Sequence, residues 1–235
     1  MGLAGELLER LYNANDADYR DQIVALAPRC EKLLDVGCDD GAYTSLLAEK
    51  TGAAVSGIEA SEHAELARAR GYDVRDADLE ARWPFDDGEF DLVHANQVIE
   101  HVKRLDHFVL EIRRVLRPGG TAIVCTENLA SWHNIGALLL GQMPFSLTNI
   151  SSKGAIGNRF ARHTGSAGGT GETWQHIHVV TVPALTAIFE VHGFEVTDVF
   201  ASGYYPAFGR VGHELAKRNP QHAHFIGVVA VKQGE

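Results

Sequence analysis

Short apolar runs alternate with helix-like segments along most of this chain. Over residues 30–128 the runs lie in "KLLDVG", "AVSGIEA", the starts of "YDVRDADL" and "FDLVHANQVIEHV", and "TAIVCTEN". Near-continuous apolar strands separated by helices are typical of a parallel sheet that is covered on both faces. Because crossovers between parallel strands are right-handed, the pattern predicts a doubly wound, Rossmann-like α/β fold.

The helices expected between these strands have recognisable ends. "YTSLLAEKTG" stops at Gly52, and "SEHAELARARG" has Ser61 as its N-cap and Gly71 at its end. The following helix, "LDHFVLEIRRVLRPGG", is expected to stop at the Pro-Gly-Gly of residues 118–120, with a strand from residue 121.

The remaining segments complete a single domain, which suits 235 residues of which 45% are apolar. We expect a helical cap over 1–29, a core over 30–128, and a return to the regular pattern over 176–235. There "VPALTAIFEVHG" predicts a helix, and "FEVTDVFASG" and "FIGVVAVKQ" predict strands. Residues 129–175 interrupt the rhythm with the short helix "SWHNIGALLLG" and a stretch rich in Gly, Ser and Thr. A connection this long is usually a lid, a binding loop or disordered.

Charge and composition exclude several classes of protein. A net charge of −10 argues against nucleic-acid binding, which needs a basic face. Three widely spaced cysteines, Cys30, Cys38 and Cys125, form neither a disulfide framework nor a metal pattern. The N-terminus lacks the features of a signal peptide, and the longest apolar run is far shorter than the roughly 20 residues of a membrane span. These features predict a cytoplasmic protein.

Ligands of an open α/β sheet bind beyond the carboxyl ends of its strands, so the residues that follow each strand are the candidates. After the first strand, Gly37 and Gly41 frame a turn that opens a helix. Asp39 occupies the position of the second glycine of the dinucleotide fingerprint GxGxxG, which is therefore absent. After the second strand, Glu59 can accept hydrogen bonds from a ribose diol. The alternative is that it interacts with the dipole of the next helix.

An ordered series of motifs resembles one family. "LLDVGCDDG", "GIEAS", "DADLEARWPFDDGEFDLVHANQVIEHV", "VLRPGG" and "HIHVVT…L…IFEVHGFEV" are together similar to the class I S-adenosylmethionine-dependent methyltransferases, and to their small-molecule branch in particular. The resemblance is strong over 30–130 and weaker over 176–232. It implies a seven-stranded sheet with an antiparallel last strand, a core that binds S-adenosylmethionine, and S-adenosylhomocysteine as a product.

The resemblance also implies roles for individual residues. The glycine turn would lie near the methionine end of the cofactor, Glu59 would bind the ribose, and Asp78 would face the adenine amine, with Asp76 as the alternative. The implied cofactor-binding residues are Asp35, Gly37, Asp39, Gly41, Glu59, Ala60, Asp78, Leu79, His94 and Asn96. Glu100 and His101 form the "EH" pair that is common in this branch.

Asp39 departs from the family pattern, which usually has glycine there. Aspartate tolerates left-handed backbone angles better than most residues, so the turn remains possible. Two interpretations stay open: its carboxylate pairs with the positive charge of the cofactor, or it is a solvent-facing turn residue.

Transfer to an oxygen acceptor usually needs a base or a metal, whereas an amine acceptor needs only its neutral form. Histidine suits the role of base near pH 7. His176 and His178 are the first candidates, because on a strand they would share one face; His101 is a third. No metal site is expected, since no carboxylate-and-histidine spacing stands out.

The segment 129–175 is expected to cover a small-molecule acceptor, with its glycine-rich part ordering when ligands bind. Candidate wall residues are Trp132, Met143, Phe145, Phe160 and Trp174; the alternative for Met143 and Phe145 is that they anchor the segment on the core. The oligomeric state is open between monomer and homodimer. Rival functions are a nicotinamide oxidoreductase, a non-catalytic cofactor-binding module, and a protein or RNA methyltransferase.

Overall fold

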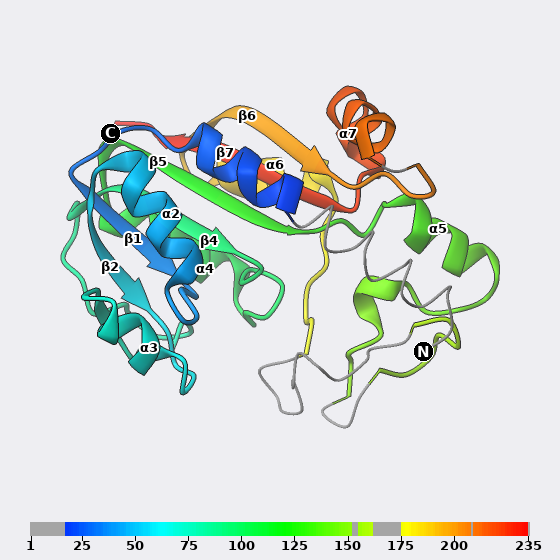
Figure 1. The fold of residues 1–235 in the computed structure, drawn as a ribbon, viewed down its shortest axis with the longest axis horizontal. Coiled ribbons are helices and arrows are strands. Elements are labelled where there is room, and N and C mark those ends of the chain that lie inside the picture. The colour runs from blue at the N-terminus through cyan, green and yellow to red at the C-terminus, as the bar shows by residue number, and fades with distance from the viewer. Residues whose placement is uncertain (1–16, 152–154, 162–174, 208, 235) are drawn as a thin grey trace.

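A seven-stranded sheet forms the centre of the computed structural model, which describes residues 17–151, 155–161, 175–207 and 209–234. The strand order is β3-β2-β1-β4-β5-β7-β6 (Figure 1). The strands are β1 (Lys32–Val36), β2 (Ala54–Ile58), β3 (Asp73–Arg75), β4 (Phe90–Asn96), β5 (Leu116–Glu127), β6 (Phe194–Ser202) and β7 (Phe225–Lys232).

The directions of the strands confirm the predicted mostly parallel sheet. β1 pairs in parallel with β2 and β4, β2 with β3, and β4 with β5. β7 runs antiparallel to both of its neighbours, β5 and β6. The carboxyl ends of β1, β2, β3, β4 and β5 therefore share one edge, where ligands of such sheets bind.

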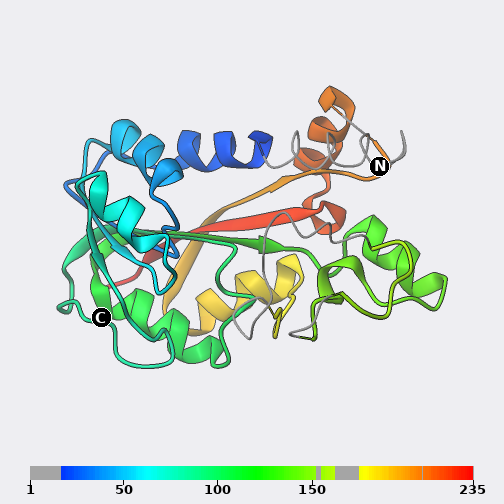
Figure 2. The same cartoon turned by 60° about the horizontal axis from the view of Figure 1, so that its bottom comes forward.

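Helices cover both faces of this sheet (Figure 2). The helix over residues 17–26 and α2 lie on one face, and α4 and α6 lie on the other. The helices are 17–26, α2 (Ala42–Thr51), α3 (Ala64–Ala69), α4 (Leu105–Val115), α5 (Trp132–Leu139), α6 (Val182–Val191) and α7 (Gly209–Arg218), with 3₁₀ turns η1 (Phe145–Leu147) and η4 (Pro220–His222). None of the helices in these described ranges is long and apolar enough to cross a bilayer.

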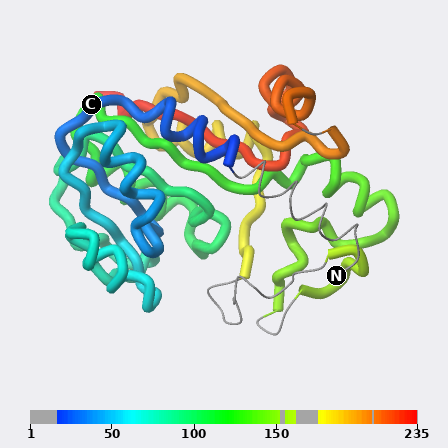
Figure 3. Tube along the Cα trace, in the orientation of Figure 1, coloured from blue at the N-terminus to red at the C-terminus, as the bar shows by residue number. Residues whose placement is uncertain are grey.

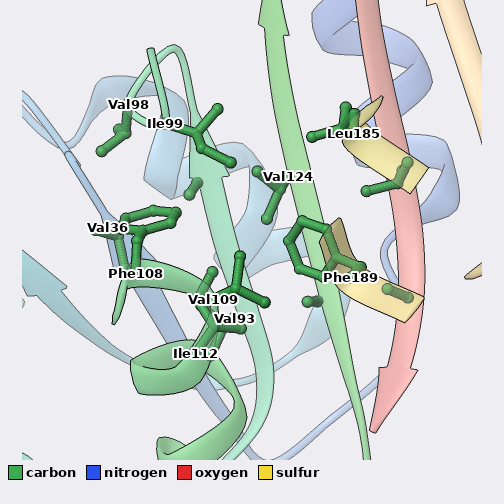
Figure 4. Packing of buried hydrophobic residues seen from close by; sticks show 14 of the residues in the cluster. Val36, Val93, Val98, Ile99, Phe108, Val109, Ile112, Val124, Leu185 and Phe189 are labelled. Atoms are coloured by element: carbon green, nitrogen blue, oxygen red, sulfur yellow. The ribbon is translucent and has the colours of Figure 1, made fainter. Parts of the chain in front are cut away.

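The larger part of the core lies between the sheet and the helices α4 and α6 (Figure 4). The apolar positions of α4 recur at helical spacing, so Phe108, Val109 and Ile112 fall on one face and are fully buried. They pack with strand residues such as Val93 and with Phe189 of α6. Burying each of these side chains contributes about 1.5–3 kcal/mol.

The opposite face is covered by the helix over residues 17–26. Tyr19 and Ile23, one turn apart, are fully buried against Leu33, Leu92 and Phe225. The Tyr19 ring stacks on Phe225 with 4.9 Å between centroids. This helix is part of the expected cap over 1–29; residues 1–16 lie outside the described residues.

Two expected element boundaries differ in the structure. α3 begins at Ala64, because the hydroxyl of Ser61 accepts the backbone N–H of His63 and caps no helix. β5 begins at Leu116 and so includes the Pro-Gly-Gly of 118–120. There the register with β4 is irregular, and a Cβ on Gly120 would lie 2.9 Å from the carbonyl oxygen of Arg117. The tight bulge lets the strand start immediately after α4.

The described part of the insertion that follows β5, residues 129–151 and 155–161, lies beyond the carboxyl end of that strand (Figure 3). Within its described part, the Asn134 side chain donates to the carbonyl of Asn128 at 3.0 Å and to the hydroxyl of Ser146 at 2.9 Å. These buried bonds tie α5 both to the end of β5 and to η1. The sequence "TGSAGGTGET" and Trp174 lie outside the described residues, so the expectation that this part orders on ligand binding stays a prediction.

Candidate functional site

The turn after β1 requires glycine at both of its ends. Gly37 has φ +73°, and a Cβ there would lie 2.5 Å from Cγ2 of Val98. Gly41 has φ +75°, and a Cβ there would lie 3.1 Å from the backbone of Ala67 in α3. The two glycines therefore let the turn pack closely against the loop after β4 and against α3.

Asp39 lies inside this turn at φ 48°, in the left-handed region that aspartate tolerates. Its carboxylate contacts Nδ1 of His63, and its side chain is 68% exposed. The hydrogen bond to Asp39 raises the pKa of His63. The position of the second glycine in GxGxxG is thus held by a carboxylate that is paired with a histidine before α3.

Glu59 follows β2 and links the ends of two strands. Its carboxylate accepts the backbone N–H of Asp39 at 3.0 Å and that of Ser61 at 2.8 Å. An ionised carboxylate offers about four lone-pair sites, so two remain for further donors. The half-buried Glu59 is therefore fixed in place and can still receive the two hydroxyls of a ribose.

Asp35 lies beneath the turn, with only 2% of its surface exposed. Its Oδ1 lies 2.7 Å from Nδ1 of His94, which is directly opposite on β4, and its Oδ2 accepts the Thr44 hydroxyl at 2.6 Å. Since both oxygens bond to protein groups, Asp35 orients His94 and the start of α2. Its predicted direct contact with a cofactor stays a prediction.

Two buried polar atoms at the end of β4 have no hydrogen-bond partner among the described residues. They are Nε2 of His94 and Oδ1 of Asn96. Nδ1 of His94 faces the carboxylate of Asp35, so Nδ1 is the donor of that pair, and Nε2 is an acceptor in the neutral ring. Leaving such atoms unpaired costs about 1–3 kcal/mol each, so a ligand that donates hydrogen bonds here would offset that cost.

The residues expected near an adenine lie at the same edge but are more open. Ala60, Asp76 and Asp78 are exposed, and Leu79 is half-buried against the core. Oδ1 of Asp78 accepts the backbone N–H of Glu80 at 2.9 Å. These contacts do not decide between Asp78 and Asp76, so the contact of either residue with the adenine amine stays a prediction.

The three histidines proposed as bases do not share one environment. Residues 176 and 178 belong to no strand, so the condition under which they would share a face is not met. His178 Nε2 lies 3.3 Å from the carbonyl of Lys103, whereas the His176 ring meets the His101 ring at a centroid distance of 4.8 Å. The cause is the carbonyl of Glu100, which accepts the N–H groups of residues 177 and 178 at 2.7 and 3.1 Å and holds the segment as an irregular turn.

Burial changes the protonation of the "EH" pair. It lowers the pKa of His101 to about 4, with a further contribution from His176 nearby. Burial also raises the pKa of Glu100 to about 8, with the nearby carboxylate of Glu127 acting in the same direction. His101 is accordingly a weak base near neutral pH.

Several residues and contacts of this region have no recognisable signal in the sequence. Thr44 and His63 have no motif of their own and become visible only through their bonds to Asp35 and Asp39. Glu100, His101 and His176 come together although about 75 residues separate the pair from the third member. The grouping depends on the conformation of the segment after the insertion. The periodicity of the sequence does not encode that conformation.

Comparison with known proteins agrees with this geometry. A family model described as a methyltransferase domain matches residues 8–199. A Streptomyces halstedii methyltransferase, GfsG, is 41% identical over 38% of this chain and 35% of its own length. The mitochondrial ubiquinone biosynthesis O-methyltransferase of Rattus norvegicus is 28% identical over 76% of this chain and 48% of its own length. The chain thus spans between a third and a half of these relatives.

Solved structures share the fold over nearly the whole chain. A possible histamine N-methyltransferase from Thermotoga maritima has a TM-score of 0.62, with 18% identity, over 97% of this chain and 96% of its own. An S-adenosylmethionine-dependent methyltransferase from Methanosarcina mazei has a TM-score of 0.63, with 21% identity, over 91% and 98% of the two chains. At these identities the likeness concerns the fold, including the antiparallel β7.

Proposed function

Because this chain belongs to the class I S-adenosylmethionine-dependent methyltransferases, we propose that it methylates the oxygen or nitrogen of a small molecule by in-line displacement. The observation that carries the proposal is the position of Glu59. Its carboxylate is held by the turn after β1, at the carboxyl edge of the sheet, with capacity for two more hydrogen bonds. That arrangement suits the ribose of S-adenosylmethionine.

Hydrogen-bond acceptors at the same edge of the sheet suit the rest of the cofactor as well. Nε2 of His94 and Oδ1 of Asn96 can accept hydrogen bonds from the ammonium group at the methionine end. Asp78, with Asp76 as the alternative, would accept from the adenine amine. S-adenosylmethionine supplies a methyl group on a sulfonium, which is already a good leaving group. The protein therefore contributes mainly alignment of the acceptor, worth several kcal/mol.

The acceptor would lie between the ends of β4 and β5 and the segments 129–151, 155–161 and 175–180. The support for this is that both segments adjoin the carboxyl ends of those strands and that α5 exposes apolar side chains, among them Trp132 at 42% and Leu139 at 82%. Of the three histidines, His176 is the preferred base, because His101 is a weak base and His178 turns toward Lys103. Amine acceptors would need only their neutral form.

The test is a binding and turnover experiment on the full chain. Isothermal titration calorimetry should detect one equivalent of S-adenosylhomocysteine per chain and no NAD⁺. Incubation with S-adenosylmethionine and separate panels of phenols, catechols and primary amines should release S-adenosylhomocysteine in at least one panel. Binding without turnover in every panel would favour the non-catalytic module, and binding of NAD⁺ alone would favour the oxidoreductase.

A further inference from the structure

A second group of polar side chains lies near the carboxyl edge of the sheet. None of its members is among the residues proposed to bind the cofactor. Glu100 and His101 follow β4, and His176 comes from the segment that re-enters the fold after the insertion. One potential ligand atom from each of the three lies within 4.8 Å of the other two. The group therefore combines one carboxylate with two imidazoles in a small volume.

Glu100 is fully buried at the centre of this group. Its Oε2 accepts the hydroxyl of Thr126 at 3.0 Å, whereas Oε1 has no hydrogen-bond partner within the described ranges. A buried carboxylate oxygen without a partner is costly, and a bound cation would offset that cost. The carboxyl group of Glu127 lies 3.7 Å from Nδ1 of His176, so a second acidic side chain adjoins the group.

The hydrogen bonds of the two histidines leave their Nε2 atoms able to bind a metal ion. Nδ1 of His101 lies 3.0 Å from the carbonyl of Gln175, and Nδ1 of His176 lies 2.7 Å from the carbonyl of Ser146. Since a carbonyl oxygen can only accept, each Nδ1 carries the proton and each Nε2 carries a lone pair. A backbone carbonyl on the far nitrogen is the usual support of a metal-bound histidine.

We propose that Glu100, His101 and His176 bind a divalent first-row transition-metal ion such as Zn²⁺. Two imidazoles and one carboxylate suit such an ion, whereas Mg²⁺ prefers oxygen ligands alone. Ligand atoms around a tetrahedral ion with bonds of about 2.0–2.2 Å lie roughly 3.3–3.6 Å apart. The ligand atoms, which lie within 4.8 Å of one another, would therefore move closer together by up to about 1.5 Å when the ion binds.

Three protein ligands leave one position of the ion open, as in catalytic zinc sites. If the proposed function holds, that position would take the hydroxyl of an oxygen acceptor, and with the ion bound His176 would be a ligand rather than the base. The ion lowers the pKa of a bound hydroxyl, so the proton leaves to solvent before the oxygen attacks the methyl carbon. The C–S electron pair then stays on sulfur, and S-adenosylhomocysteine is released.

The test is Zn²⁺ titration of the full chain after treatment with a chelator, followed by calorimetry, with Co²⁺ absorption as a second readout. The native protein should bind one equivalent of Zn²⁺ at this site. Glu100→Gln and His176→Gln should each weaken that binding at least about 10-fold and abolish the Co²⁺ spectrum. His178→Gln is the matched control, because its ring lies two residues away and faces Lys103; it should bind Zn²⁺ as the native protein does.

Titration of the same proteins with S-adenosylhomocysteine separates the two proposals. Native protein that binds S-adenosylhomocysteine but no stoichiometric Zn²⁺ would overturn the metal site and leave the methyltransferase proposal standing. Zn²⁺ binding that is unchanged in both variants would also overturn it. If the native protein did not bind S-adenosylhomocysteine, the proposed function would be wrong, whereas the metal site would stand. Should Glu100→Gln fail to fold, His176→Gln decides, because its side chain is 15% exposed and less central to the core.

Discussion

Glu59 accepts the backbone N–H of Asp39 at 3.0 Å, and this bond joins the end of β2 to the turn after β1. The same carboxylate accepts the N–H of Ser61. The candidate ribose site is thus built from neighbouring strand ends before any ligand arrives. A site held in advance loses less conformational freedom on binding.

Replacing Glu59 with alanine should weaken S-adenosylhomocysteine binding about 10- to 100-fold, because two charge-assisted hydrogen bonds to the ribose are lost. Calorimetry measures the change. Glu62→Ala is the control, since that neighbouring carboxylate is exposed. Native-like affinity in Glu59→Ala would make the ribose role wrong.

Gly37→Ala should lower the free energy of unfolding by about 2–4 kcal/mol, because the new methyl group meets Val98 at 2.5 Å and the backbone has φ +73°. Gly71→Ala is the matched control. Its φ is +94°, but nothing lies within 4 Å of the added carbon, so it reports backbone strain without the clash. Equal destabilisation in urea titrations would show that the close contact with Val98 does not matter.

Thr44→Val should destabilise the protein by about 1–3 kcal/mol, because it leaves an oxygen of the buried Asp35 carboxylate without its 2.6 Å hydrogen bond. Thr44→Ser keeps the hydroxyl and should cost less. Chemical denaturation compares the two variants. If valine were tolerated as well as serine, the hydrogen bond would contribute nothing measurable to the turn.

Stability should fall as the pH drops from about 6.5 toward 4, in part because burial lowers the pKa of His133 to about 4. Above pH 6.5 the ring is neutral in both states; below it the unfolded chain takes up a proton that the folded chain excludes. His133 packs on Phe145, Tyr205 and His224, and His224 also has a lowered pKa.

His133→Phe should therefore reduce the loss between pH 6.5 and 4 by up to about 3 kcal/mol, since phenylalanine keeps the ring and removes the titration. Melting temperatures measured across this range test it. Some pH dependence should persist because His224 remains. An identical pH profile in the variant would show that His133 does not titrate differently in the two states.

The sheet and its functional edge could be predicted because local patterns encode them. The alternation of apolar runs and helices, together with the family resemblance, predicts the sheet, and Gly37 and Gly41 mark the turn after β1. Boundaries were less accurate where a tertiary contact overrides a local signal. The sequence predicts Ser61 as an N-cap. In the structure its hydroxyl accepts the N–H of His63 within a turn, and its own N–H donates to the Glu59 carboxylate.

The candidate catalytic region was harder to predict, since its geometry depends on contacts across the chain. The carbonyl of Glu100 fixes residues 177 and 178, and this places His176 against His101 while His178 turns away. No pattern within residues 176–178 encodes that difference. Because the grouping of Glu100, His101 and His176 depends on the same long-range contact, residue spacing does not reveal it.

A crystal structure of the full chain with S-adenosylhomocysteine tests the central claim most directly. Both ribose hydroxyls should lie within hydrogen-bond distance of the Glu59 carboxylate, and the methionine moiety should lie at His94 and Asn96. A ligand bound elsewhere, or a ribose that does not contact Glu59, would contradict it.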